Sequence, residues 1–196
     1  MVEEQVRQLS LDLYRQEMVG KPCRRVKKSD DLMPLIEEMV RFCRSHGGTG
    51  LAAPQIGEYL QLAIAFTTPA NIDLTPGVPL IRATGVTEVL INPEIVNLGG
   101  RDLLETEGCL SLPPADQATA RVWRSEIAHV RSGTLEDPDA NMVTVYKGGP
   151  ARIVQHEIDH LNGVFFIDHC GPVGRNIVLR RFGKYLRNQR IEKEKE

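Results

Sequence analysis

Two histidines four residues apart, with a glutamate directly after the first, are the residues of this chain best suited to chemistry. They form the run His156-Glu157-Ile158-Asp159-His160. Residues four apart lie on one face of a helix, about one turn from each other, so both imidazoles can bind a single metal ion. Glu157, next to the first histidine, can reach a water molecule bound there. The run therefore predicts a helical metal site with a base beside it.

Two histidines do not complete such a site, because a catalytic centre of this kind has three protein ligands and an open position for water. The third ligand is either a downstream residue, for which His169 is available, or an upstream cysteine. The candidate cysteine is Cys109, which follows Gly108 in the run EGCLSLP. The residue types alone leave both alternatives open. The remaining cysteines are predicted to be small buried hydrophobic residues: Cys23, Cys43 and Cys170.

The histidine pair needs a helix that is anchored to a core. The helix is expected over Pro150 to Asn162, because Pro150 suits the first helical position and Gly163 can end the helix. Its apolar face consists of Ile153, Val154, Ile158 and Leu161.

The segments around this helix predict strands and further helices. An amphipathic helix is expected over Ser29 to Gly47, a long loop over Thr68 to Gly85, and a basic helix over Asn176 to Glu196. Strands are expected at Leu60 to Thr67, at Val86 to Leu98 with a break at Asn92-Pro93, and in the runs LLETEGCLSLP, VWRSEIAHVRSG and NMVTVY. Together they predict an α+β fold with antiparallel sheets packed around a central metal-binding helix, and a C-terminal helix.

Composition restricts the class of protein. The chain has 196 residues, with 24 basic and 26 acidic side chains and 41% hydrophobic residues, which suits one globular domain and excludes a disordered chain. Although the basic and acidic side chains nearly balance over the whole chain, its end is basic, because the segment from Arg180 onward has seven Lys or Arg against three Glu. No window approaches the roughly 18 uninterrupted apolar residues of a membrane helix, and the N-terminus lacks the apolar core of a signal peptide. We expect a cytoplasmic protein with no membrane partner.

Three blocks of sequence carry a resemblance to a known family. Gly50-Leu51-Ala52-Ala53-Pro54-Gln55-Ile56-Gly57, Glu107-Gly108-Cys109-Leu110-Ser111 and Gln155-His156-Glu157-Ile158-Asp159-His160 resemble, in this order, the three signature motifs of the peptide deformylases. The resemblance covers most of the chain. It implies a metal-dependent hydrolase that removes the formyl group from the N-terminal N-formylmethionine of newly made polypeptides and releases formate.

The resemblance also implies a role for each matched residue. The metal ligands would be Cys109, His156 and His160, which selects the cysteine as the third ligand. Glu157 would act as general base and acid, while the Gln55 side chain and the Leu110 N–H would stabilise the oxyanion. The substrate backbone is expected to lie against Gly48, Gly50, Leu51 and Gly108 as an added strand.

Cofactor and partners follow from the same resemblance. One divalent metal ion is expected, Fe²⁺ by resemblance, with Zn²⁺ or Ni²⁺ as alternatives that suit a thiolate and two imidazoles. The substrates would be N-formyl-methionyl nascent peptides, and the basic C-terminal helix is a candidate for contact with the ribosome rather than with DNA. Residues 1–175 would form the catalytic domain and residues 176–196 a basic helix or tail.

Charge pairs around the site are a further expectation. Asp159 is expected to orient a ligand or to pair with a cation such as Arg121, and Glu107 to pair with Arg121 or Arg152. The run Gly148-Gly149-Pro150-Ala151-Arg152 departs from the deformylase pattern, which has a large apolar residue after the glycine that helps to line the methionine pocket. This departure predicts a changed or relaxed preference for the first side chain.

Two rival functions remain open at this level. A metalloprotease would share the two histidines and the glutamate but gives no reason for the Gln55 and Cys109 blocks. A deformylase-like binding protein without activity would keep the fold, although every residue that catalysis needs is present. Release of formate, internal cleavage of a peptide, and no reaction at all distinguish the three.

Overall fold

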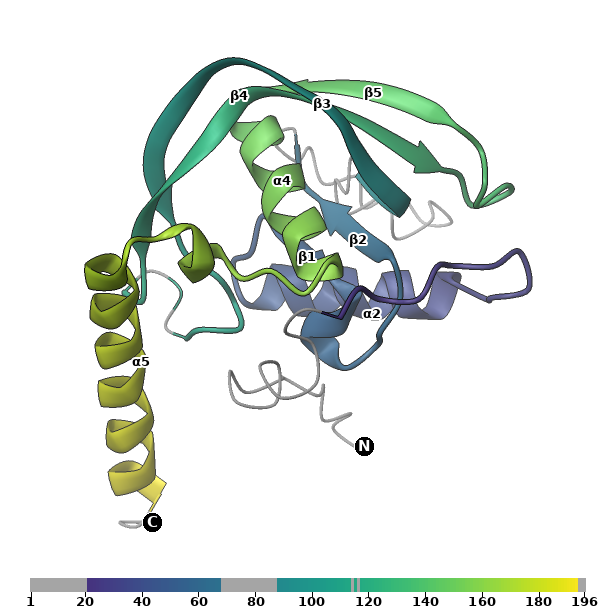
Figure 1. The fold of residues 1–196 in the computed structure, drawn as a ribbon. Coiled ribbons are helices and arrows are strands. Elements are labelled where there is room, and N and C mark those ends of the chain that lie inside the picture. The colour runs from purple at the N-terminus through teal and green to yellow at the C-terminus, as the bar shows by residue number, and fades with distance from the viewer. Residues whose placement is uncertain (1–20, 68–87, 114, 116, 194–196) are drawn as a thin grey trace.

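One bent antiparallel sheet surrounds a helix in the computed structural model, which describes residues 21–67, 88–113, 115 and 117–193 (Figure 1). Neighbouring strands follow chain order, and each pairs antiparallel with the next. The strands are β1 (Gly50–Ala52), β2 (Leu62–Ala65), β3 (Glu88–Glu107), β4 (Ala120–Gly133) and β5 (Met142–Lys147). The helices are α2 (Met33–Ser45), α4 (Gly149–Leu161) and α5 (Pro172–Lys193), with 3₁₀ turns at Ala53–Ile56 and Phe166–His169. The predicted α+β architecture is confirmed.

Alternating side chains on β1 and β2 separate two cores. Alanines on one face, Ala52, Ala63 and Ala65, belong to the core that contains α4. The larger Leu51, Leu62 and Ile64 on the other face belong to the core that contains α2. Because side chains of a strand alternate between faces, small residues on one face let α4 lie close to the backbone of β1 and β2.

Strand β3 is longer than the sequence predicts. We expected separate strands on either side of Gly99-Gly100, but β3 runs through this point to Glu107. The ladder with β4 shifts register at Ile91/Glu94, at Ile95/Asn97 and at Gly99/Asp102. Bulges of this kind bend a strand without ending it, and Asn92 and Gly100 adopt the positive φ angles of 50° and 72°. The bends curve the long β3–β4 ribbon around α4 (Figure 1).

The predicted helices form, with different ends. Helix α4 has Pro150 in its first turn, and Gly163 follows it with a φ of 73°. Helix α2 begins at Met33, four residues after the expected start at Ser29. The Asp30 carboxylate instead accepts hydrogen bonds from the Lys27 N–H and from Arg24 in a preceding turn. The loop predicted at 68–85 lies outside the described residues.

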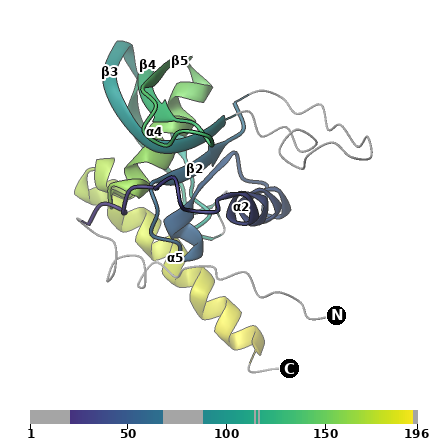
Figure 2. The same ribbon diagram turned by 90° about the vertical axis from the view of Figure 1, so that its right-hand side faces the viewer.

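Helix α5 runs down one side of the molecule in Figure 1 and extends diagonally away from the sheet in Figure 2. It begins at Pro172, four residues before the predicted start. Val178 and Phe182 are buried in the same core as α4, while the C-terminal part of the helix is exposed. Within the described residues, no helix is long and apolar enough to cross a membrane.

Candidate metal centre and substrate cavity

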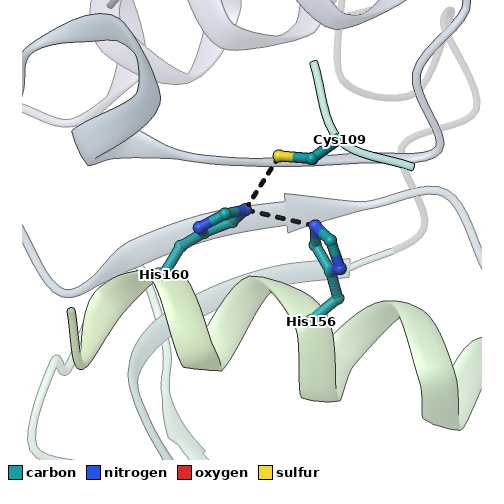
Figure 3. A group of neighbouring side chains, drawn as sticks. All are labelled: Cys109, His156 and His160. Carbon is teal, nitrogen blue, oxygen red and sulfur yellow. Dashed lines mark hydrogen bonds between the residues drawn. The ribbon is translucent and has the colours of Figure 1, made fainter. Parts of the chain in front are cut away.

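Three candidate ligand atoms converge where the end of β3 meets α4 (Figure 3). The Cys109 Sγ lies 3.3 Å from the His160 Nε2, which lies 3.1 Å from the His156 Nε2. All three atoms lie within 4.8 Å of one another. The alternative ligand His169 lies elsewhere, with its Nε2 2.7 Å from an Asp159 carboxylate oxygen. The structure therefore brings Cys109, and not His169, to the histidine pair.

The donor set fits a divalent transition metal. Cysteine and histidine ligands lie about 2.0–2.3 Å from zinc, so ligands of one ion stand roughly 3–4 Å apart. The sulfur–nitrogen and nitrogen–nitrogen distances above agree with that spacing. A thiolate and two imidazoles would hold the ion with three protein ligands and would leave a further position for water or substrate, as in catalytic rather than closed structural sites.

Glu157 places a buried carboxylate beside this centre. Its side chain is 4% exposed, and its Oε2 has no hydrogen-bond partner among the described residues. Burial raises the pKa of Glu157 to about 7, near the working pH of a proton-transferring base. Gly50 of β1 makes room for it, since a Cβ there would lie 2.5 Å from the Glu157 Oε1. An unpartnered buried oxygen beside an open ligand position suits a role with water.

Glu107 contacts the ring nitrogen of His156 that faces away from the metal centre. Its Oε2 lies 3.0 Å from the His156 Nδ1, which directs the other ring nitrogen to the metal centre. Arg124 donates from Nε and Nη2 to the two carboxylate oxygens at 3.0 and 3.1 Å, and Arg152 donates from Nη1 at 2.6 Å. Burial raises the pKa of Glu107, but these hydrogen bonds, from His156 first and then from Arg124, bring it well below its usual range. Glu107 is therefore an anionic acceptor of four hydrogen bonds.

Asp159 pairs with a cation, as expected, but the cation is Arg124 and not Arg121. Asp159 binds Arg124 Nη1 at 2.5 Å and also His169, whereas Arg121 donates to the backbone carbonyl of Leu104. Arg121 was also wrong as a partner of Glu107, and the alternative Arg152 was right. Arg121 and Arg124 are three positions apart on β4 and therefore lie on opposite faces of the strand. Arg124 points into the core, and Arg121 does not.

The pKa values of the two histidines are shifted in opposite directions. Burial lowers the pKa of His156, but hydrogen bonds with Cys109 and Glu107 outweigh it and raise the pKa well above the ordinary value. For His160, burial followed by the charge of His156 lowers the pKa well below the ordinary value. Because a metal-binding imidazole is neutral, metal binding has to displace a proton from His156.

Gln55 points its amide at the metal centre. The Ala52 N–H donates to its Oε1 at 2.7 Å, which leaves the amide Nε2 3.4 Å from the Cys109 Sγ and 3.2 Å from the Ser111 Oγ. The 3₁₀ turn at Ala53–Ile56 holds the side chain, which is 4% exposed. The group therefore presents a donor next to the metal ligands.

A cavity of about 640 Å³ opens over these residues. Its size is typical of ligand sites, which measure about 300–1,000 Å³. Of the predicted substrate-contact residues, Gly48, Gly50 and Gly108 line it, and so does Leu110, which was predicted to stabilise the oxyanion. Leu51 does not, because its side chain is fully buried against α2, and only its backbone in β1 stays available for strand pairing.

Comparisons with known proteins agree with this arrangement. The family model for polypeptide deformylase matches residues 10–176. The chain belongs to the polypeptide deformylase family. It is 34% identical over 177 residues to the peptide deformylase of Bartonella bacilliformis, a match that covers 90% of each chain. It is also 34% identical over 175 residues to that of Thermodesulfovibrio yellowstonii, covering 89% of this chain and 96% of the relative.

Solved structures of the family have the same fold. The crystal structure of a peptide deformylase from Legionella pneumophila superposes with a TM-score of 0.70 at 31% identity, covering 92% of this chain and 95% of that one. A peptide deformylase from Synechococcus elongatus, crystallised with actinonin, superposes with a TM-score of 0.67 at 33% identity and covers 86% and 82%. Like other members of this family, the chain is therefore a metal-dependent hydrolase.

Sequence reasoning missed three residues of the site. Arg124 is a buried cation on the inward face of β4. The alternation of side chains along the predicted strand could have placed it on that face. Ser111, within the second signature block, lies within hydrogen-bond distance of the Gln55 amide. Tyr185 of α5 lines the cavity, a position that the pattern of the C-terminal helix did not indicate.

Proposed function

We propose that this chain removes the formyl group from the N-formylmethionine of nascent polypeptides, and that Cys109, His156 and His160 hold its single metal ion. The observation that carries the proposal is the convergence of these three ligand atoms at a cavity that also contains Glu157 and Gln55. A bound divalent ion supplies Lewis acidity, which polarises a carbonyl oxygen and lowers the pKa of water toward neutrality. The chain's own residues supply the proton transfers and the donors.

Glu157 moves the proton. Its carboxylate accepts a proton from the water that attacks the formyl carbon and returns it to the nitrogen of the leaving amine as the C–N bond breaks. The products are formate and a free N-terminus. The unpartnered Oε2 and a pKa of about 7 suit both steps, because the group is ionised in part and protonated in part near neutral pH.

Gln55 and Leu110 stabilise the charge on the formyl oxygen. The Gln55 Nε2 donates to that oxygen as it becomes negative, and the backbone N–H of Leu110 is proposed as the second donor. Preorganised donors act strongly in a buried site, and removal of one typically costs about 10²–10³-fold in rate. Gly48, Gly50 and Gly108 let the substrate backbone lie close, and β1 is an edge strand among the described residues, to which a peptide strand can be added.

The metal is proposed to be Fe²⁺, with Zn²⁺ or Ni²⁺ as substitutes. A thiolate with two imidazoles suits all three ions, and the resemblance to the family favours iron. Elemental analysis of anaerobically purified protein, with activity measured per bound metal, tests the assignment. Activity that follows zinc and not iron would overturn it.

The basic helix is proposed to contact the ribosome, and the enzyme to work in the cytoplasm, where nascent chains emerge. Exposed cations in the described part of the helix support this contact: Arg180, Lys184 and Arg187. The test is cosedimentation with ribosomes at increasing salt. Binding of the wild-type protein should weaken as salt rises, and it should do so more steeply than binding of the double variant Lys184→Ala/Arg187→Ala. Equal, salt-independent binding of both proteins would remove the proposal. Residues 1–175 are the proposed catalytic domain. The first turns of α5 pack on its core through Val178 and Phe182.

Formate release from a formyl-Met-Ala-Ser peptide, with the peptide followed by mass spectrometry, tests the reaction. The wild-type protein is expected to release formate and leave the remaining peptide intact, whereas Glu157→Gln is expected to be nearly inactive. Internal cleavage would instead indicate a metalloprotease. Tight peptide binding with no reaction by metal-loaded protein would indicate a binding protein.

A further inference from the structure

Tyr185 of α5 belongs to the wall of the same cavity as the metal ligands. Val178 and Phe182, on the same face of the helix, are 0% and 6% exposed and are buried in the core around α4. Tyr185 follows Phe182 by three residues, so it continues this face past the end of the core. Its side chain is half-buried there and borders the cavity.

A backbone segment ties α5 to the loop that carries Cys109. The Arg181 Nη1 donates to the carbonyl of Gln117 at 3.1 Å. Two residues earlier in that segment, the carbonyl of Ala115 lies so close to Gly108 that a Cβ at Gly108 would collide with it. These two contacts place α5 close to the loop that carries Cys109.

The cavity is lined by side chains of different chemistry. Polar groups lie at the metal end: Gln55, Cys109, His156 and Glu157. The lining also includes Pro113, Ala115 and Tyr185, which offer an aromatic ring and two small apolar side chains. If the formyl carbon is to be attacked at the metal end, the residues after the first must extend along the rest of the cavity. An apolar side chain gains contact area against a ring and a proline.

We propose that Tyr185 is a specificity-determining residue that contacts the peptide beyond the formylated methionine and favours an apolar side chain there. The inference rests on the proposed deformylase function and assigns α5 a part in substrate selection that is separate from its basic charge. It concerns the chain after the first residue, so it is independent of the preference for methionine.

The test compares kcat/KM for three substrates: N-formylmethionine amide, formyl-Met-Ala-Leu and formyl-Met-Ala-Asp. For Tyr185→Ala, the ratio of kcat/KM for formyl-Met-Ala-Leu to that for the amide should fall about five- to tenfold, mainly through KM, as expected for the loss of one aromatic contact. The preference for Leu over Asp should shrink by a similar factor. Tyr185→Phe keeps the ring and should restore both ratios.

Leu186→Ala is the matched control, because Leu186 is the next residue of α5 and is 46% exposed. It should leave both ratios at their wild-type values. Thermal unfolding of each variant checks that α5 remains packed, and a KM effect confined to the longer peptides is not expected from general loosening of the fold. Unchanged ratios for Tyr185→Ala, or equal losses with all three substrates, would overturn the inference while leaving the proposed function intact. A wild-type protein inactive on all three substrates would overturn both.

Discussion

Replacement of Glu107 by glutamine should separate the structural role of this carboxylate from catalysis. Glu107 is buried, with a side chain 5% exposed, and accepts hydrogen bonds from Arg124, Arg152 and His156. Each carboxylate oxygen accepts two of the four bonds, so an amide NH₂ in place of either oxygen faces at least one arginine N–H and loses that hydrogen bond. Hydrogen bonds to charged groups contribute about 1.5–3 kcal/mol each, and breaking a buried ion pair costs about 3–5 kcal/mol.

We therefore expect Glu107→Gln to lower the free energy of unfolding by about 3–5 kcal/mol at pH 7. For a chain of this size the corresponding fall in Tm is about 6–20 °C. The sign of the pH dependence follows from the pKa of Glu107, which is lower in the folded protein than the ordinary value of 4.5. The stabilisation is fully present above the unfolded pKa and is lost as the pH falls toward the folded pKa. The gap in Tm should therefore narrow in acid.

The assay is thermal unfolding of metal-free protein between pH 3 and pH 8, followed by zinc titration against a chelator. Since Glu107 orients His156, zinc affinity should fall about 10–100-fold. The control is Glu105→Gln, because Glu105 accepts one bond from Arg152 at 3.0 Å and its side chain is 55% exposed. That change should cost less than about 1 kcal/mol. An unchanged Tm and zinc affinity for Glu107→Gln would refute the reasoning.

Four further predictions concern catalysis and metal binding. Glu157→Gln should lower kcat about 10²–10⁴-fold in a formate-release assay and leave metal stoichiometry unchanged, since it removes only the proton acceptor; a kcat within tenfold of wild type would count against this role. Gln55→Glu keeps the acceptor for the Ala52 N–H but removes the amide donor, so kcat should fall at least about 10²-fold, and burial of the new carboxylate should also lower Tm; full activity would rule the donor out. Gly50→Ala places a Cβ 2.5 Å from the Glu157 Oε1, so it should lower kcat and reduce the free energy of unfolding by about 1–3 kcal/mol; unchanged kcat and stability would contradict the tight contact. Zinc affinity should rise with pH between 6 and 8, because the metal competes with the proton of His156, whose pKa is raised; competition with a chelator at each pH measures it, and a flat profile would contradict the assignment.

The fold was largely predictable from local patterns. Helix α4 could be predicted within a residue of its ends, because Pro150 and Gly163 act locally on the backbone. The continuity of β3 could not, because whether a bulge bends or ends a strand depends on the partner strand that accepts the shifted register. Glycine pairs such as Gly99-Gly100 mark the place of the irregularity but not its outcome.

The candidate site divides in the same way. The spacing of His156 and His160 is a property of one helix and is visible in the sequence, whereas the choice between Cys109 and His169 as their neighbour depended on a resemblance until the fold was known. Partners of buried charges were least predictable, since Arg121 and Arg124 are chemically alike and differ only in which side of β4 they face. Side-chain direction relative to the core, rather than residue type, decides such pairs.

The separation of the ligands along the chain has a consequence for folding. Cys109 and His160 are 51 residues apart, and the segment between them contains β4, β5 and nearly all of α4. An ion held by both would cross-link this segment, and it could do so only after the β3–β4 ribbon has formed and α4 has docked against it. In the unfolded chain the same closure carries the entropic cost of a long loop. Metal binding should therefore act as a late step that locks an already assembled chain.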